Sequence, residues 1–377
     1  MPAALGATLA AVAVLGNAVA SEATAPTQRT LDVSMCGVFF FVDVSVTGSE
    51  NEAGEPLAEP DEKRILSFVY DTGASNTFVD PDALFEATGS RVKEGKRVNI
   101  QGARSGDARF TNFRARTRDL DHLSVALGRD VEGILAHDAF SGWVAEMDYQ
   151  EGSITITQGA LPSADERAVF STKGPDERPW LAVNFEGRER RILIDTGSTG
   201  HFALNKLERF DLESAPVTVG YAVRINRLEK RRGARLAGTA RFGGFAIPSP
   251  QLSEAPKTEL FGGQVLRDFR LRYDANNRRM GFETYSDEPI GIAPPITSTG
   301  LIWAPEDGNL SVKGILPGFE DAVGDIEVGD VVTAMNGKPL AERGCSDPRQ
   351  PVGATTLTVK RDGQTLQRVV EPTTLIP

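Results

Sequence analysis

Two aspartates stand at the ends of two apolar runs, and each is followed by threonine and glycine. The first run is ILSFVY (residues 65–70) and the second is RILI (residues 191–194). A strand of this kind is buried on both faces, so an ionised carboxylate at its end is costly unless something stabilises it. Glycine two residues further on allows a tight turn in which backbone N–H groups reach the carboxylate. The pattern predicts two stabilised carboxylates, Asp71 and Asp195, suited to general acid–base chemistry.

An internal repeat puts these two aspartates in equivalent places. Residues 133–156 follow the first aspartate and resemble residues 259–283, which follow the second. The two segments align without a gap, so that Leu135 corresponds to Phe261 and Asp148 to Asp274. Two copies of one unit, about 120 residues each, predict pseudo-two-fold symmetry that could bring both turns to one axis. The two carboxylates would then face each other.

The residues beside the aspartates have predicted supporting roles. Each threonine can hydrogen bond across to a neighbouring loop, and each glycine allows close backbone approach. The copies differ after the glycine, because a hydroxyl in the second copy can donate to its aspartate and a methyl group in the first cannot. We hypothesise from this difference that Asp195 is more often the ionised base and Asp71 the acid. The supporting residues are Thr72, Gly73, Ala74, Thr196, Gly197 and Ser198.

Short apolar runs rich in Val, Ile and Phe, separated by Gly, Pro, Asn and Asp, predict a mostly β fold. Helical patterns are scarce, and the best candidates are PDALFEAT and LNKLERF, one after each aspartate. Connectors rich in proline and charge separate the copies and end the second one. We expect a signal peptide at 1–20, a first lobe at 21–165, a second lobe at 166–290 and a small domain at 291–377.

The duplicated motif resembles that of the aspartic peptidases, and most closely of the retropepsin-like members, here fused into one chain. The resemblance covers about residues 36–283 and departs from the family at Ala136, where a glycine is usual. It implies two pseudo-symmetric acid-protease β-barrel lobes that together form one active site. It also implies that Asp71 and Asp195 share one proton and activate a water molecule, as in the aspartic proteases generally. Neither a metal nor a cofactor is needed, and the chain is expected to work as a monomer.

The resemblance also implies a substrate cleft covered by hairpin flaps. The candidates are residues 97–110, with Gly102 in the turn, and residues 217–226, with Tyr221 near the tip. An ordinary strand tyrosine remains the alternative for Tyr221. His137 and His201 lie near the motifs, and a structural role is expected for both.

The last 80 or so residues, counted from Ser298, contain Gly-Asp and Asn-Gly turns between short apolar strands, which favour a small β domain. The segments GDVV (residues 329–332) and NGKP (residues 336–339) resemble the PDZ domains of exported bacterial proteases. Such domains capture extended peptides at a sheet edge, and a packing role without peptide binding is the alternative. The loop implied to hold a peptide carboxylate is Gly300, Leu301, Ile302 and Trp303.

The composition and the amino-terminal segment restrict the setting in which the protein acts. A net charge of −11 argues against a nucleic-acid partner. The uncharged apolar start, which ends in Ala18-Val19-Ala20, predicts a signal peptide and hence a periplasmic or secreted protein. A second long apolar run is absent from the sequence, so no integral membrane span is expected. The two cysteines, Cys36 and Cys345, could pair in an oxidising compartment or remain separate buried thiols.

The sequence therefore predicts an exported aspartic endopeptidase whose partner is a peptide or protein substrate. A peptide-binding scaffold that keeps the fold without turnover is the alternative. The intact pair of aspartates distinguishes the two functions, because a binding module has no need of two carboxylates in costly symmetric positions.

Overall fold

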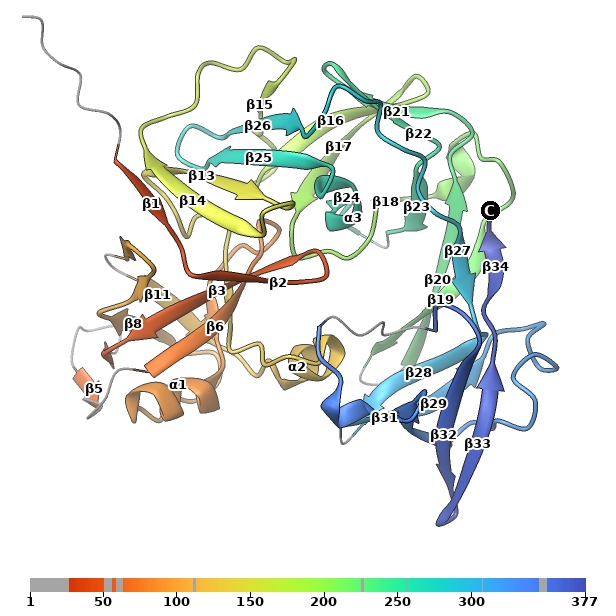
Figure 1. Cartoon of the computed structure of the whole chain (residues 1–377). Coiled ribbons are helices and arrows are strands. Elements are labelled where there is room, and N and C mark those ends of the chain that lie inside the picture. The colour runs from red at the N-terminus through yellow and green to blue at the C-terminus, as the bar shows by residue number, and fades with distance from the viewer. Residues whose placement is uncertain are drawn as a thin grey trace, which may run out of the picture.

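The computed structural model describes residues 27–50, 56–58, 64–110, 113–224, 227–255, 257–306, 308–345 and 351–377. The predicted signal peptide at 1–20 lies outside these residues. The described chain is mostly β, as the sequence predicted (Figure 1). Within the described ranges, no helix has the length and apolar character needed to cross a membrane.

The first lobe is an eleven-stranded sheet with the order β10-β9-β3-β6-β12-β7-β11-β8-β4-β5, and β2 pairs with β3 beside it. Helix α1 (Pro81–Thr88) begins where Asp80 accepts hydrogen bonds from two backbone N–H groups and ends at Gly89, whose φ is +70°. Helix α2 (Asp121–Leu127) was not predicted. The strands are β2 (Val33–Cys36), β3 (Phe39–Val46), β4 (Gly48–Glu50), β5 (Pro56–Ala58), β6 (Arg64–Tyr70), β7 (Phe78–Val79), β8 (Arg97–Gln101), β9 (Arg104–Ser105), β10 (Ala108–Arg109), β11 (Phe113–Thr117) and β12 (Gly133–Leu135).

The second lobe is a nine-stranded sheet with the order β19-β20-β23-β18-β24-β17-β16-β21-β22. The predicted helix in LNKLERF is only a 3₁₀ turn, η1 (Leu207–Arg209), and α3 (Gly263–Leu266) is one short turn. The strands are β16 (Trp180–Phe185), β17 (Arg188–Asp195), β18 (Phe202–Leu204), β19 (Val217–Arg224), β20 (Arg227–Arg235), β21 (Thr239–Phe242), β22 (Phe245–Pro248), β23 (Gln251–Glu254) and β24 (Leu260–Gly262).

The strand pairing confirms the internal repeat. In the first lobe β6 runs parallel to β12, so that Tyr70 lies opposite Leu135. In the second lobe β17 runs parallel to β24, and Ile194 lies opposite Phe261. The next strand in each lobe, β7 or β18, pairs antiparallel with β12 or β24. Each aspartate therefore follows a central strand that the repeat places identically.

A third sheet joins the two lobes, with the order β1-β14-β13-β25-β26-β15. Strands β13 and β25 pair antiparallel across the junction, with Met147 opposite Leu271, and both side chains are fully buried. One hydrophobic core runs through both lobes, which fixes their relative position. The strands are β1 (Gln28–Thr30), β13 (Trp143–Asp148), β14 (Ser153–Gln158), β15 (Val169–Ser171), β25 (Phe269–Asp274) and β26 (Arg279–Thr284).

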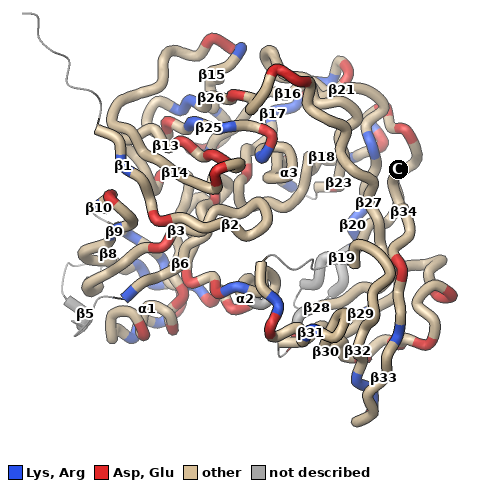
Figure 2. The backbone as a smooth tube through the Cα atoms, in the orientation of Figure 1, with Lys and Arg blue, Asp and Glu red and all other residues tan. Residues whose placement is uncertain are grey.

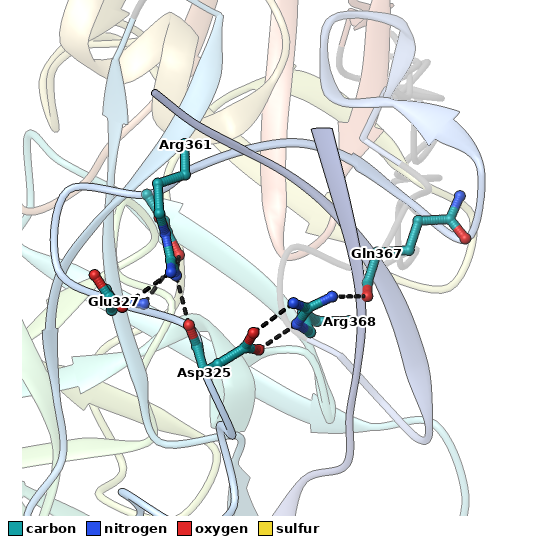
Figure 3. Close-up of polar contacts among 6 residues, drawn as sticks. Asp325, Glu327, Arg361, Gln367 and Arg368 are labelled. Atoms are coloured by element: carbon teal, nitrogen blue, oxygen red, sulfur yellow. Dashed lines mark hydrogen bonds and ion pairs between the residues drawn. The ribbon is translucent and has the colours of Figure 1, made fainter. Parts of the chain in front are cut away.

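The C-terminal part of the chain forms a C-terminal sheet with the order β28-β29-β30-β32-β33, with β31 beside β30, and a separate two-stranded sheet of β27 and β34. Its own core lies around Val312, Val332 and Leu357. Two arginines hold one of its turns. Arg361 forms a double hydrogen bond with the buried Asp330, at 2.6 and 2.7 Å. Figure 3 shows Arg368 paired with Asp325, and Arg361 beside Glu327. The elements are β27 (Ile296–Ser298), β28 (Leu301–Glu306), β29 (Asn309–Ile315), β30 (Val331–Met335), β31 (Lys338–Pro339), η2 (Leu340–Glu342), β32 (Thr355–Arg361), β33 (Gln364–Val370) and β34 (Thr373–Ile376).

The C-terminal sheet contacts both lobes. Its edge strand β28 contacts helix α2 of the first lobe and strand β19 of the second, and β34 contacts β19 and β20 (Figure 1). A disulfide between Cys36, at the end of β2, and Cys345 ties it to the first lobe. The sequence left open whether Cys36 and Cys345 pair, and in the structure they form a disulfide. Acidic and basic residues are interspersed over the lobes and this sheet (Figure 2).

Candidate active site

The two predicted aspartates lie against each other's loops. A Cβ atom built on Gly73 would lie 2.6 Å from the Asp195 Cγ, and one built on Gly197 would lie 2.4 Å from the Asp71 Cγ. Any side chain at either position would collide with the opposite carboxyl group, which is why glycine is required there. Each carboxyl group therefore lies against the glycine of the opposite turn. The structure therefore brings together the pair that the sequence predicted.

The two threonines lock the turns together across the lobes. The Thr72 hydroxyl donates to the Ile194 carbonyl at 2.8 Å, and the Thr196 hydroxyl donates to the Tyr70 carbonyl at 2.9 Å. Each hydroxyl also accepts the backbone N–H of the other threonine, at 3.0 and 3.2 Å. Both threonines are fully buried. Four mutual hydrogen bonds thus fix the position of the two aspartates.

Replacing Thr196 by valine is expected to lower the free energy of unfolding by about 2–4 kcal/mol, because it leaves a buried N–H and a buried carbonyl without partners. The measurement is urea denaturation at pH 7, and Thr365→Val, at an exposed site on β33, is the matched control. A loss below about 1 kcal/mol would show that the threonines do not hold the lobes together.

The two aspartates differ in their backbone hydrogen bonds. Asp71 Oδ1 accepts the N–H groups of Gly73 and Ala74, at 2.8 and 3.0 Å. Asp195 Oδ1 accepts only the N–H of Gly197, at 3.0 Å. Burial raises the pKa of both carboxyls, and the pKa of Asp195 rises further because the charge of Asp71 adds to it. The extra backbone hydrogen bond therefore favours the charged form of Asp71 over that of Asp195.

The hydrogen bonds favour the opposite assignment to the roles hypothesised from the sequence. The Ser198 hydroxyl was expected to donate to Asp195, but it accepts the N–H of Gly200 at 3.4 Å and lies near Gly262. Among the described contacts, none joins the Ser198 hydroxyl to the Asp195 carboxyl. The Ser198 hydroxyl therefore supports the turn of the second copy. In the first copy, the Ala74 N–H donates a hydrogen bond to the Asp71 carboxylate and so stabilises its charged form.

The loops opposite the aspartates show why Ala136 is tolerated where its counterpart must be glycine. A Cβ atom on Gly262 would lie 2.4 Å from the Gly200 carbonyl oxygen, and the Gly262 N–H donates to the His201 carbonyl. In the first copy the Ala136 N–H donates to the Thr77 hydroxyl at 3.1 Å instead. The buried methyl group of Ala136 therefore has room in a loop held by a side chain.

Burial lowers the pKa of both histidines near the motifs, to about 4 for His201. Both are consequently neutral at pH 7, and the His201 carbonyl serves as a backbone acceptor for Gly262. These contacts agree with the structural role expected for His137 and His201.

Both flap candidates contain a pair of antiparallel strands, β9 with β10 and β19 with β20. Residues 97–110 form β8, β9 and β10, and the turn at Gly102 packs against the Thr47 side chain within the first-lobe sheet. The sequence also paired the two candidates wrongly, because β8 corresponds to β20, which pairs antiparallel with β23 as β8 does with β11. Tyr221 lies on β19 opposite Lys230 in the β19–β20 hairpin, and its side chain lies outside the described atoms.

The predicted carboxylate loop of the C-terminal sheet is partly satisfied from within. The Gly300 N–H donates to the Ser298 hydroxyl at 3.0 Å, and the Gly300 carbonyl accepts the N–H of Leu316. Leu301 and Ile302 are buried. Trp303 is half-buried and packs on the core of this sheet. The Gly300 N–H is thus already used, and Leu301, Ile302 and Trp303 are paired with β29.

Three other acidic residues lie close enough to suggest a cation site. Carboxylate oxygens of Asp80, Asp119 and Asp121 lie within 4.8 Å of one another. The Asp80 carboxylate accepts the N–H groups of Asp82 and Ala83 at the start of α1, and the N–H of Leu120. The buried member of the cluster is therefore a helix cap, and the other two are exposed.

Sequence reasoning missed Arg178, which donates to the Gly73 carbonyl at 2.9 Å from the other lobe. One feature of the sequence could have drawn attention to Arg178. A charged residue stands there, just before the first strand of the second copy, whereas the first copy has an apolar run at the equivalent place. Compared with known proteins, the chain matches no family model, and no curated protein is similar enough to count as a relative.

Proposed function

We propose that this protein is an aspartic endopeptidase of the retropepsin-like type, with both lobes of one active site in a single chain. The observation that carries the proposal is the close approach of each glycine to the opposite aspartate, which places two carboxyl groups face to face. Like charges at such a separation cannot both ionise, so the pair holds one proton at intermediate pH. One charged and one neutral carboxyl are what general acid–base hydrolysis requires.

In the proposed reaction, the charged Asp71 takes a proton from a water molecule, and the water oxygen forms a bond to the scissile carbonyl carbon. The neutral Asp195 donates a hydrogen bond and then its proton to the carbonyl oxygen. The tetrahedral intermediate collapses as the C–N bond breaks: the leaving amine takes the proton from Asp71, and one hydroxyl group of the intermediate returns its proton to Asp195. The product acid and amine together contain the atoms of the peptide and one water, and the pair returns to its starting charge.

The pKa shifts give the pH range of this mechanism. Activity needs Asp71 ionised, so it falls as the pH drops through the pKa of Asp71, which lies above the usual carboxyl value. It also needs Asp195 protonated, so it falls as the pH rises through the pKa of Asp195, which is raised further. We therefore expect a bell-shaped profile of kcat/KM whose two limbs both lie above the ordinary aspartate pKa.

The C-terminal sheet is proposed to be a PDZ-like module that recruits peptide or protein substrate. Support comes from its edge strand β28, which is the place where such a module adds a peptide strand, and which contacts both lobes. We propose that the protein is exported, and the Cys36–Cys345 disulfide supports this because disulfides persist in oxidising compartments.

The test is to incubate the purified chain with a peptide library at pH 3 to 8 and to identify products by mass spectrometry. The expected result is internal cleavage by the wild type and a rate at least about 10³-fold lower for the Asp71→Asn/Asp195→Asn double variant. Library peptides that bind to the wild type and stay intact at every pH would favour the non-catalytic scaffold over the peptidase.

A further inference from the structure

Arg178 connects the second lobe to the loop that holds Asp71. It lies just before β16 and is half-buried. Its Nη1 donates to the Gly73 carbonyl of the first lobe at 2.9 Å. Its Nε and Nη2 donate to Asp176 Oδ2 at 3.0 and 2.6 Å, and Asp176 Oδ1 also accepts the Trp180 indole N–H. The guanidinium is thus held rigidly while one N–H points at the first-lobe turn.

The Gly73 carbonyl and the Ala74 N–H belong to the same peptide group. Arg178 binds this group at its oxygen, and its N–H donates to Asp71 Oδ1 at 3.0 Å. A cation at the oxygen polarises the peptide group and strengthens the hydrogen bond that its N–H donates. Arg178 therefore acts on the Asp71 carboxylate through one peptide group as well as through its own charge.

The first lobe offers no equivalent cation to Asp195. Trp180 pairs with Leu193, two residues before Asp195, and Phe41 pairs with Val69, two residues before Asp71. Trp180 thus corresponds to Phe41, and the counterpart of Arg178 is Phe39.

Phe39 is a buried member of the apolar cluster around the disulfide. The N–H groups of Ala74 and of its counterpart Ser198 each donate to the main-chain oxygen of their own aspartate at 3.2 Å, but only the Ala74 N–H also donates to the carboxylate, among the described contacts. The two aspartates therefore differ in their electrostatic surroundings, because within the described residues only the Asp71 turn contacts an arginine of the opposite lobe.

Other charges face the arginine and the pair. Arg178 is hydrogen bonded to the Asp176 carboxylate. Tyr70 lies near Asp71 and Tyr149 lies near Asp195, and burial raises the pKa of both tyrosines. Arg178 lowers the pKa of both Asp71 and Asp195, but only Asp71 also receives the hydrogen bond through the peptide group. The groups around the arginine and the pair are Asp176, Glu177, His137, Asp138, Arg278, Tyr70 and Tyr149.

We propose that Arg178 is a positioning residue that makes Asp71, and not Asp195, the ionised member of the pair, by holding and polarising the Gly73–Ala74 peptide group. This inference rests on the proposed peptidase function, and it assigns the base to one lobe. Among the described contacts, no hydrogen bond joins the Arg178 guanidinium to either carboxyl group, so its effect passes through the peptide group and through the electric field.

The test compares Arg178→Gln, which can still donate a hydrogen bond but has no charge, with Arg178→Lys, which keeps the charge. Removing the positive charge raises the pKa of Asp71, so the acidic limb of kcat/KM should move up by about one pH unit in Arg178→Gln, a tenfold loss at low pH. Arg178→Lys should restore most of this shift. Arg278→Gln is the matched control, because Arg278 binds the Asp176 carbonyl in the same cluster.

A second readout needs no activity. Carbon-13 NMR of labelled aspartate carboxyls should show Asp71 titrating at higher pH in Arg178→Gln than in the wild type and in Arg278→Gln. Unchanged titration and an unchanged acidic limb in a folded Arg178→Gln would overturn the role of Arg178. A wild type that cleaves no peptide would overturn the peptidase function instead, while the NMR titration still decides whether Arg178 acts on Asp71.

Discussion

Replacing either Asp71 or Asp195 by asparagine is expected to lower kcat/KM for peptide cleavage by at least about 10³-fold. Asparagine keeps the shape of the side chain but can neither take a proton from water nor pass one to the substrate. The measurement is initial cleavage rates on the best library peptide at the pH optimum of the wild type. The matched control is Asp362→Asn, which removes an exposed carboxylate from a turn of the C-terminal sheet.

The stability of the same variants separates lost chemistry from lost folding. The pKa of Asp195 is raised in the folded chain, so the stability from its neutral form is complete below the ordinary aspartate pKa and is lost as the pH rises through the raised value. Asparagine is neutral at every pH and avoids this loss. Asp195→Asn should therefore be at least as stable as the wild type at pH 7, and a variant that unfolds there would contradict the assignment of the proton to Asp195.

Removing the disulfide is expected to lower the free energy of unfolding by about 2–5 kcal/mol. The bond joins residues 309 positions apart and is the one covalent tie between the described first lobe and the C-terminal sheet apart from the chain itself. Near it, an open pocket of about 710 Å³ is lined by residues of both parts, among them Arg129, Leu310 and Cys345.

The measurement is chemical denaturation of the Cys36→Ser/Cys345→Ser double variant beside the wild type with and without a reductant. Reductant should destabilise the wild type to the level of the double variant and should leave the double variant unchanged. A double variant as stable as the oxidised wild type would show that noncovalent contacts of β28 and β34 suffice to hold the C-terminal sheet.

The parts of the site that could be predicted from the sequence are those that a local pattern encodes. An apolar run followed by Asp-Thr-Gly specifies a buried strand, a polar end and a tight turn within a few residues. Its duplication then specifies the symmetry that brings Asp71 to Asp195. The same reasoning located α1, because Asp80 and Pro81 mark a helix start and Gly89 marks its end.

The remaining features depend on contacts between distant segments. The Ser198 hydroxyl accepts the N–H of Gly200 and lies near Gly262. The presence of a hydroxyl group next to the Asp-Thr-Gly motif does not reveal this orientation. Arg178 reaches Gly73 only because the third sheet fixes the two lobes against each other. The pairing of Cys36 with Cys345 likewise depends on where the C-terminal sheet packs.

The flap comparison failed for a related reason. Two segments at similar distances from their aspartates were treated as equivalents, although strand partners and not sequence distance define equivalence. The pairing of β8 with β11 and of β20 with β23 shows that the first lobe has no counterpart of β19 at the same position in the chain.

Whether the two aspartates act as one unit is tested most directly by comparing the rate of the Asp71→Asn/Asp195→Asn double variant with the rates of the two single variants. Residues that act together are not additive, so the double variant should cleave no more slowly than either single variant. Losses that multiply in the double variant, or a single variant within tenfold of the wild type, would contradict a shared-proton pair formed by Asp71 and Asp195.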